Sequence, residues 1–139
     1  MLGQGLYSFL AAAPTITALV GTPNNRADST TGIFPLQMPE GTPLPALVIQ
    51  EIAGTGIVTM DGASGLWTSR VQFDSYGKTL ADAATLAKAT RLLLEGMNAT
   101  LPDGTEVDVA SVLHRQDDFE FAPFIFRALL ELDFWYREP

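Results

Sequence analysis

The chain has 139 residues, of which 47 % are apolar and 17 % charged, a length and balance that suit one domain with a hydrophobic core and exclude a disordered chain. It contains no cysteine, which excludes disulfides, thiolate metal sites and a cysteine nucleophile. Its formal net charge of -8 argues against a reader of DNA sequence, because most of the surface repels phosphate.

The first 21 residues predict two short helices separated by a proline. Apolar residues recur at helical spacing over residues 2–12. Pro14 lacks an amide hydrogen and disfavours helical backbone at Ala13, so the first helix ends there and a second one begins, with Gly21 just past its end. No apolar run approaches the roughly 20 residues that span a bilayer, and no basic segment marks a signal peptide. We therefore expect neither a membrane segment nor export from the cytoplasm in which the chain is made.

Residues 21–45 predict a long loop. They hold five of the nine prolines, and their one extended piece is Ile33-Phe34-Pro35. Loops of this length inside a compact domain are usually functional or disordered until bound. We expect this loop, together with the glycine-rich hairpin at residues 54–65, to be mobile in the isolated chain and ordered against a neighbour.

The middle of the chain predicts strands over residues 46–53, 55–60 and 66–76, with a turn at Asp61-Gly62. In the last of these strands Trp67, Val71 and Phe73 fall on one side of a period-two pattern.

Residues 80–95 predict the best helix, which opens at Thr79 with a capping pattern. One face of this helix is apolar and suits the core. A second face combines small and apolar side chains: Ala81, Thr85, Ala89 and Leu92. This second face is either an exposed stripe of good helix formers or the site of a second packing partner.

The C-terminal part predicts a hairpin around Asp103-Gly104, with strands at residues 99–101 and 106–112, and a final strand over residues 126–137. In the final strand Leu129 and Trp135 fall on the charged face. We expect a single α+β domain over residues 1–139, with a largely antiparallel sheet and two main helices packed on one face.

Several apolar residues lie where a monomer does not need them, and we take them as candidate contacts with other subunits or partners. Each has an alternative interpretation, since a loop or helix of the same chain could cover it. Aromatic anchors are enriched at interfaces, which favours the tryptophans. The candidates are Ile33, Phe34, Trp67, Leu92, Leu129 and Trp135.

Chemistry-bearing motifs are scarce. His114 is the only histidine, and the nearest nucleophile candidates are Ser64 and Ser111. A lone histidine in a charged stretch is more often a solvated surface residue. With one histidine and no cysteine, a transition-metal site has few ligands, and no glycine-rich fingerprint is complete, so we expect no metal or cofactor.

The order of elements resembles that of the tail-completion family of long-tailed bacteriophages, also called tail-terminator or tail-to-head joining proteins. The resemblance covers about residues 2–138. It rests on a helix ending at Leu19-Val20-Gly21, an alanine-rich helix after residue 79, and a set of short segments. These segments are residues 33–35, 44–48, 61–66, 70–74 and 132–136.

The resemblance implies a virion protein whose copies form a ring, usually hexameric, on the head-proximal end of the tail tube. Such a ring stops tube polymerisation and joins the tail to the head connector, while DNA passes through its lumen without specific binding. The implied partners are further copies of the chain, the tail tube protein and the head completion protein.

A lumen that passes DNA needs a wall that does not bind phosphate. We expect Asp117, Asp118 and Glu120, or the acidic hairpin at residues 103–108, to face it, unless this run is a solvated loop that keeps the subunit soluble. Two alternative functions remain open: a head-tail stopper or minor tail protein, and a small cytoplasmic hydrolase that uses His114.

Overall fold

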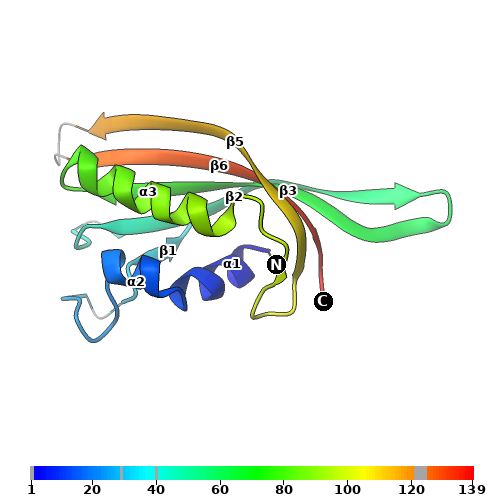
Figure 1. The fold of residues 1–139 in the computed structure, drawn as a ribbon, viewed down its shortest axis with the longest axis horizontal. Helices are drawn as coiled ribbons and strands as arrows, with labels where there is room; N and C mark the ends of the chain where they lie inside the picture. Colours follow the sequence, from blue (N-terminus) through cyan, green and yellow to red (C-terminus); the bar gives the residue numbers. More distant parts are fainter. Residues whose placement is uncertain (1, 29, 40, 121–124) are drawn as a thin grey trace.

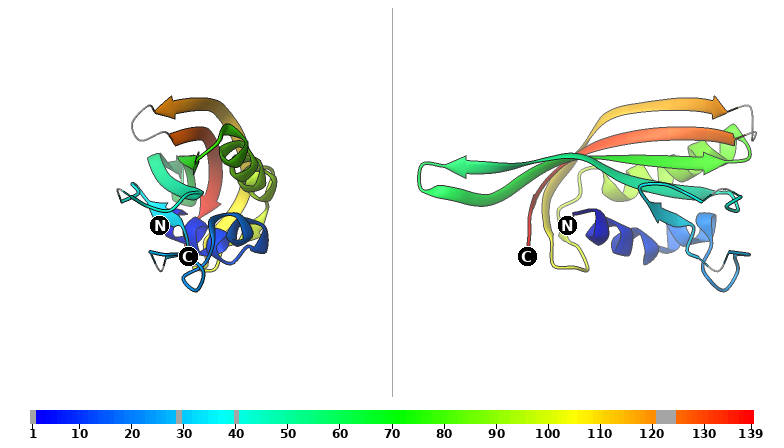
Figure 2. Two further views of the ribbon diagram at one scale, coloured as in Figure 1. Left: turned by 90° about the vertical axis from the view of Figure 1, so that its left-hand side faces the viewer. Right: turned by 180° about the vertical axis from the view of Figure 1, so that it is seen from behind.

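The computed structural model describes residues 2–28, 30–39, 41–120 and 125–139, with residue 120 described by its backbone alone. The elements in chain order are α1 (Leu2–Ala11), α2 (Pro14–Val20), β1 (Ile33–Pro35), β2 (Ala46–Thr59), β3 (Gly62–Gly77), α3 (Leu80–Leu94), β4 (Ala99–Thr100), β5 (Glu106–Glu120) and β6 (Ile125–Arg137). They form one domain in which a curled sheet partly wraps the helices (Figures 1 and 2).

The sheet has the strand order β1-β2-β3-β6-β5-β4. β1 pairs in parallel with β2, whereas the other pairs are antiparallel. The sheet is therefore mixed. The expected pair of helices on one face is also too simple, because there are three helices, and two of them lie against different parts of the curled sheet. α1 lies against β1 and β2, α3 lies against β3 and β6, and α2 contacts both of these helices.

The N-terminal helices are those that the sequence predicts. Leu2, Leu6 and Leu10 of α1 are fully buried. Ala13 has an extended backbone, and Pro14 occupies the first turn of α2, where its missing amide hydrogen costs nothing. No described helix is both long enough and apolar enough to cross a bilayer.

The core is one cluster that α3 and the central strands β3 and β6 share with α1, α2, β1, β2 and β5. Val71 pairs with Leu132, and Phe73 pairs with Leu130, as expected for two long strands in one sheet. Five large side chains of these two strands are buried: Val71, Phe73, Leu130, Leu132 and Phe134. On α3, the hydroxyl of Thr79 accepts a hydrogen bond from the Asp82 amide and so caps the first turn.

β5 is longer than the sequence predicts. We expected a strand to end at residue 112, but β5 continues to Glu120 and pairs with β6 along this length. Two register shifts, between Val107 and Val109 and between Val112 and His114, move side chains from one face to the other. The alternation that marks a strand in the sequence is broken at these bulges. The charged stretch beyond residue 112 is therefore part of the sheet.

Candidate functional site

The β2–β3 hairpin projects beyond the rest of the sheet (Figures 1 and 2). β6 pairs with β3 only as far as Leu66, so residues 57–65 have no strand partner among the described residues except each other. We call residues 57–65 the arm. The arm exposes two large apolar side chains, Val58 and Met60, the second of them completely. A two-stranded ribbon of this kind is marginally stable in water, so the arm is suited to packing against another surface.

The turn and base of the arm are held by local contacts. The Ser64 hydroxyl donates a 2.6 Å hydrogen bond to the Ile57 carbonyl, and the Thr59 hydroxyl donates one to the Gly62 carbonyl. At the base, the Trp67 ring lies across Gly56, close enough that a methyl group there would be 3.4 Å from it. The predicted interface residue Trp67 is thus half-buried in its own chain and packs on the core.

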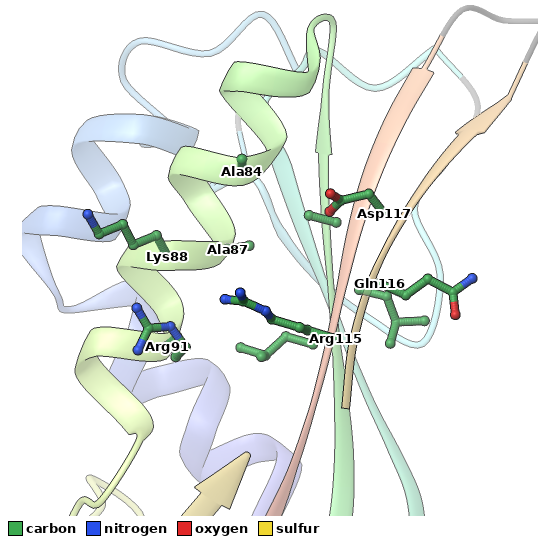
Figure 3. A pocket seen from close by; sticks show the side chains of 10 residues that line it. Ala84, Ala87, Lys88, Arg91, Arg115, Gln116 and Asp117 are labelled. Carbon is green, nitrogen blue, oxygen red and sulfur yellow. The ribbon is translucent and has the colours of Figure 1, made fainter. Parts of the chain in front are cut away.

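A groove of about 510 Å³ separates α3 from β5 and β6 (Figure 3). Ala84, Ala87, Lys88 and Arg91 line it from α3, and Arg115, Gln116, Asp117, Ala128, Leu129 and Leu130 line it from the two strands. The Arg115 side chain points from β5 towards Arg91 (Figure 3). We call this the basic groove, because three cationic side chains of a strongly acidic chain line it. The Lys88 side chain extends along the edge of α3, away from the strands (Figure 3).

Two of these three cations have no ionic partner in the described part of the chain. Five of the eight lysines and arginines form ion pairs, namely Arg26, Arg70, Arg91, Arg127 and Arg137. Among the described residues Lys78, Lys88 and Arg115 form none, and the last two line the basic groove. Leu129, a predicted interface residue, contributes to the same groove.

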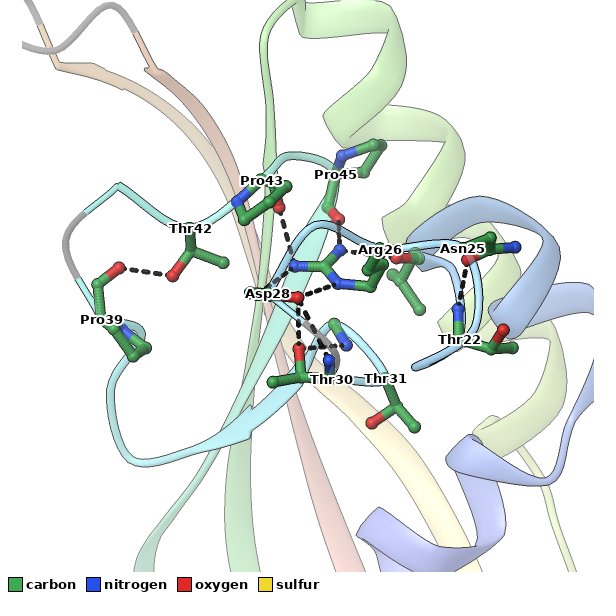
Figure 4. A network of polar contacts seen from close by, with 12 residues as sticks. Thr22, Asn25, Arg26, Asp28, Thr30, Thr31, Pro39, Thr42, Pro43 and Pro45 are labelled. Carbon is green, nitrogen blue, oxygen red and sulfur yellow. Dashed lines mark hydrogen bonds and ion pairs between the residues drawn. The ribbon is translucent and has the colours of Figure 1, made fainter.

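The loop at residues 21–45 has a polar anchor (Figure 4). The Arg26 side chain is only 5 % exposed and forms a bidentate ion pair with Asp28, with N–O distances of 3.0 and 2.9 Å. Its remaining hydrogen bonds go to the carbonyl oxygens of Val20, Pro43 and Pro45. These bonds tie the two ends of the loop together within one chain. The expected mobility of the loop in isolation stays a prediction.

The remaining interface candidates differ in exposure. Ile33 is buried in the core, and Phe34 is half-buried beside an apolar groove between α1 and β1. Leu92 is 64 % exposed on the outer side of α3, and Trp135 is 37 % exposed on the outer face of β6. Leu92 and Trp135 are thus the most accessible members of the predicted set.

The acidic run that we expected to face a lumen does not form one surface, because it lies on a strand whose side chains alternate. Asp117 pairs with Ala128 on the helix side of the sheet, and Asp118 is bound to Arg127. The hydrogen bond with Arg127 lowers the pKa of Asp118. The side chain of Glu120 lies outside the described residues. Of the two described carboxylates, Asp117 is the exposed one without an ion pair.

His114 lies exposed on β5, and its Nε2 atom is 3.2 Å from the amide oxygen of Gln116. Ser64, one of the two nucleophile candidates, lies in the arm with its hydroxyl engaged in the turn. Within the described residues, no three histidine, aspartate or glutamate side chains gather around a common point.

Comparison with known proteins decides between the classes of function. Residues 4–137 match the family described as tail completion protein gp17. The chain belongs to this family. The match spans nearly the whole domain, so the tail-completion resemblance seen in the sequence is confirmed, and the protein is a structural component of a phage virion tail. No curated protein matches the chain in sequence.

A solved structure shares the tail-completion fold seen here. It is a chain of the virion of a native gene transfer agent particle, which is 17 % identical and superposes with a TM-score of 0.70. The alignment covers 98 % of this chain and 94 % of the other. This likeness extends the shared fold over the whole domain.

The basic groove was missed in the sequence. In the sequence, Lys88 and Arg91 indicate only a solvent-exposed face of the helix. Arg115 lies in a charged stretch beyond the predicted end of the strand. Only the pairing of β5 with β6 brings these cations together. The spacing of Lys88 and Arg91, three residues apart on one helix face, is the single signal that the sequence offers.

We expect the His114→Ala variant to assemble and to support infection within a few-fold of the wild type. The imidazole is exposed, and its hydrogen bond to Gln116 is exposed as well, so its loss removes no buried hydrogen bond. Plaque counts and the yield of complete particles measure this. A variant that folds and assembles normally but does not support infection would instead favour the hydrolase.

Proposed function

We propose that the protein is a ring subunit that caps the head-proximal end of the tail tube, stops tube polymerisation and joins the tail to the head connector. The observation that carries this proposal is membership in the tail-completion family over residues 4–137. In this proposal the protein acts through contacts with other proteins and catalyses no reaction. A hexamer is the copy number that the family resemblance implies.

The surface of the subunit supports a role in assembly. Large apolar side chains are exposed at several separate places, among them Met60 on the arm, Leu92 on α3 and Trp135 on β6. Contacts between unlike patches of identical subunits form rings when the rotation between neighbours closes. A ring subunit needs such patches for its two neighbours, and further ones for the tube below and the connector above.

The passage of DNA through the ring gives Asp117 a proposed role. Its exposed carboxylate would repel phosphate at the lumen wall, whereas Asp118 is bound to Arg127 and so is less available. If Asp117 faces the lumen, the Asp117→Lys variant assembles and packs DNA, but ejects it more slowly at low salt than at high salt. Asp117 also lines the basic groove, so failed assembly with normal ejection in the residual particles would place it in a subunit contact there instead of at the lumen wall.

Deletion of the gene tests the proposed function. Without a terminator, tube polymerisation has no stop, so we expect electron micrographs to show free tails of broadly distributed and excessive length beside DNA-filled heads. Supplying the protein in trans should restore a narrow length distribution and attachment. Tails of normal length that fail to attach would favour a head-tail stopper, and attached tails with a defective tip would favour a minor tail protein.

A further inference from the structure

The arm and the basic groove lie at opposite ends of the molecule (Figures 1 and 2). β3 runs from the arm to the start of α3, and the groove residues Ala84 to Arg91 lie along α3 on that distant side. The arm of one chain therefore has no access to its own groove. Any contact between the two surfaces joins two copies of the chain.

The arm and the basic groove are complementary in charge. Asp61, at the tip, is the only charged residue of the arm. The groove offers Lys88 and Arg115, which have no ion-pair partner among the described residues. A carboxylate brought between these two cations would gain charge-assisted hydrogen bonds that neither surface has in the monomer.

The two surfaces also match in their apolar parts. Beside Asp61 the arm presents Met60 and Val58, which are exposed and flank the turn. The groove presents Ala84 and Ala87 of α3 beside its cations. The unbranched side chain of methionine adapts to an irregular surface of this kind.

The other groove of the molecule suits the arm less well. That groove, between α1 and β1, is lined mainly by apolar residues such as Phe34 and Leu36, so it fits Met60. Its lining also includes Glu51 and no lysine or arginine, whereas three cations, Lys88, Arg91 and Arg115, line the basic groove against one carboxylate, that of Asp117. A second carboxylate near Asp61 would be repelled, and no cation lines that groove to offset the repulsion.

We propose that the arm of one subunit docks in the basic groove of the next, with Asp61 between Lys88 and Arg115 and Met60 on the alanine side chains of α3. The partner is a second copy of this chain. The contact joins unlike surfaces, so its repetition around an axis produces a closed ring. The inference rests on the proposed ring and specifies the contact that builds it.

Cross-linking of introduced cysteines tests the contact, and the natural absence of cysteine keeps the background clean. We would mix an Asp61→Cys chain with a Lys88→Cys chain, assemble them on tails, and treat them with a short bismaleimide. A covalent dimer is expected from the mixture. A mixture of Asp61→Cys with Leu36→Cys, which places the second thiol in the apolar groove, should give none.

Charge reversal is a second, independent test of the contact. Asp61→Lys should reduce incorporation of the chain into tails by at least tenfold, and Lys88→Glu with Arg115→Glu should restore incorporation of that variant. Both surfaces are exposed, so all variants should keep the melting temperature of the wild type. An Asp61→Lys chain that incorporates normally would overturn the proposed contact.

The outcomes separate this inference from the proposed function. If the wild-type chain forms a ring at the tail end but Asp61→Cys and Lys88→Cys chains do not cross-link, the arm contact is overturned and the ring stands. Cross-linking of Asp61→Cys to Leu36→Cys would move the contact to the apolar groove and likewise overturn it. If the wild-type chain is absent from the tail end, the proposed function fails, and this contact fails with it.

Discussion

Truncation of either of two core side chains of β6 is expected to lower the free energy of unfolding by roughly 2–5 kcal/mol, the usual cost of large-to-small changes in a core. Leu132 and Phe134 are both fully buried. The Phe134 ring also lies against the Phe73 ring, with centroids 6.3 Å apart and planes tilted by 55°. Leu132→Ala and Phe134→Ala therefore leave cavities between the sheet and α3. Urea denaturation followed by circular dichroism measures the loss.

Leu92→Ala is the matched control for Leu132→Ala, because it makes the same chemical change at a side chain that is 64 % exposed. We expect a change within about 0.5 kcal/mol, as for most surface substitutions. A loss below about 1 kcal/mol at Leu132, or an equal loss at both leucines, would mean that the sheet faces are assigned wrongly. If Leu92→Ala also lowers incorporation into tails, its predicted role as a contact residue gains support.

Removal of the Arg26 guanidinium is expected to cost roughly 2–4 kcal/mol, because it leaves the carbonyls of Val20, Pro43 and Pro45 without a donor and Asp28 without its partner. Arg26→Ala should also raise hydrogen exchange across residues 21–45. Arg26→Lys should lie between Arg26→Ala and the wild type, since an ammonium keeps the charge but does not reproduce the planar fork.

Arg70→Ala is the control for the Arg26 prediction. Arg70 pairs with Glu131 at the same 2.9 Å, but its side chain is 51 % exposed. Exposed pairs contribute less than about 1 kcal/mol, so this variant should remain close to the wild type. Equal losses in Arg26→Ala and Arg70→Ala would show that the loop does not depend on its anchor.

The same anchor predicts how stability varies with pH. The hydrogen bond from Arg26 holds the pKa of the Asp28 carboxyl at about 2, below its usual value of 3.8. The unfolded chain therefore binds more protons at this residue between the two values. The stabilisation is complete above pH 3.8 and is lost as the pH falls towards 2. Acid titration of Asp28→Asn should show a shallower loss of stability over that range than the wild type does.

The central part of the fold can be predicted from the sequence, because its signals are local. β6 alternates cleanly between buried residues such as Leu132 and their more exposed neighbours, and β3 does so from Ser69 to Phe73. α3 has the Thr79 cap and one apolar face, and Pro14 separates α1 from α2. The hydrophobic period and the helix caps depend only on residues close together in the sequence, so these elements are predicted correctly.

The candidate site could not be predicted in the same way, because it depends on contacts between distant segments. Two β-bulges break the alternating pattern of β5, so the sequence does not show that its second half is a strand. Arg115 and Asp117 could therefore not be placed on the sheet. The parallel pairing of β1 with β2 also follows from tertiary packing, since the sequence shows only three extended residues there. The anchor at Arg26 joins residues up to 19 positions apart and leaves no pattern in the sequence.

Localisation of the protein in intact particles tests the central claim most directly. Cryo-electron microscopy of wild-type virions, with a small tag fused after Pro139, should show a closed ring of copies between the tail tube and the head connector. Each copy in the ring should match the domain described here, with the arm directed towards a neighbour. Tagged density at the distal tip of the tail, or a single copy outside any ring, would contradict the account.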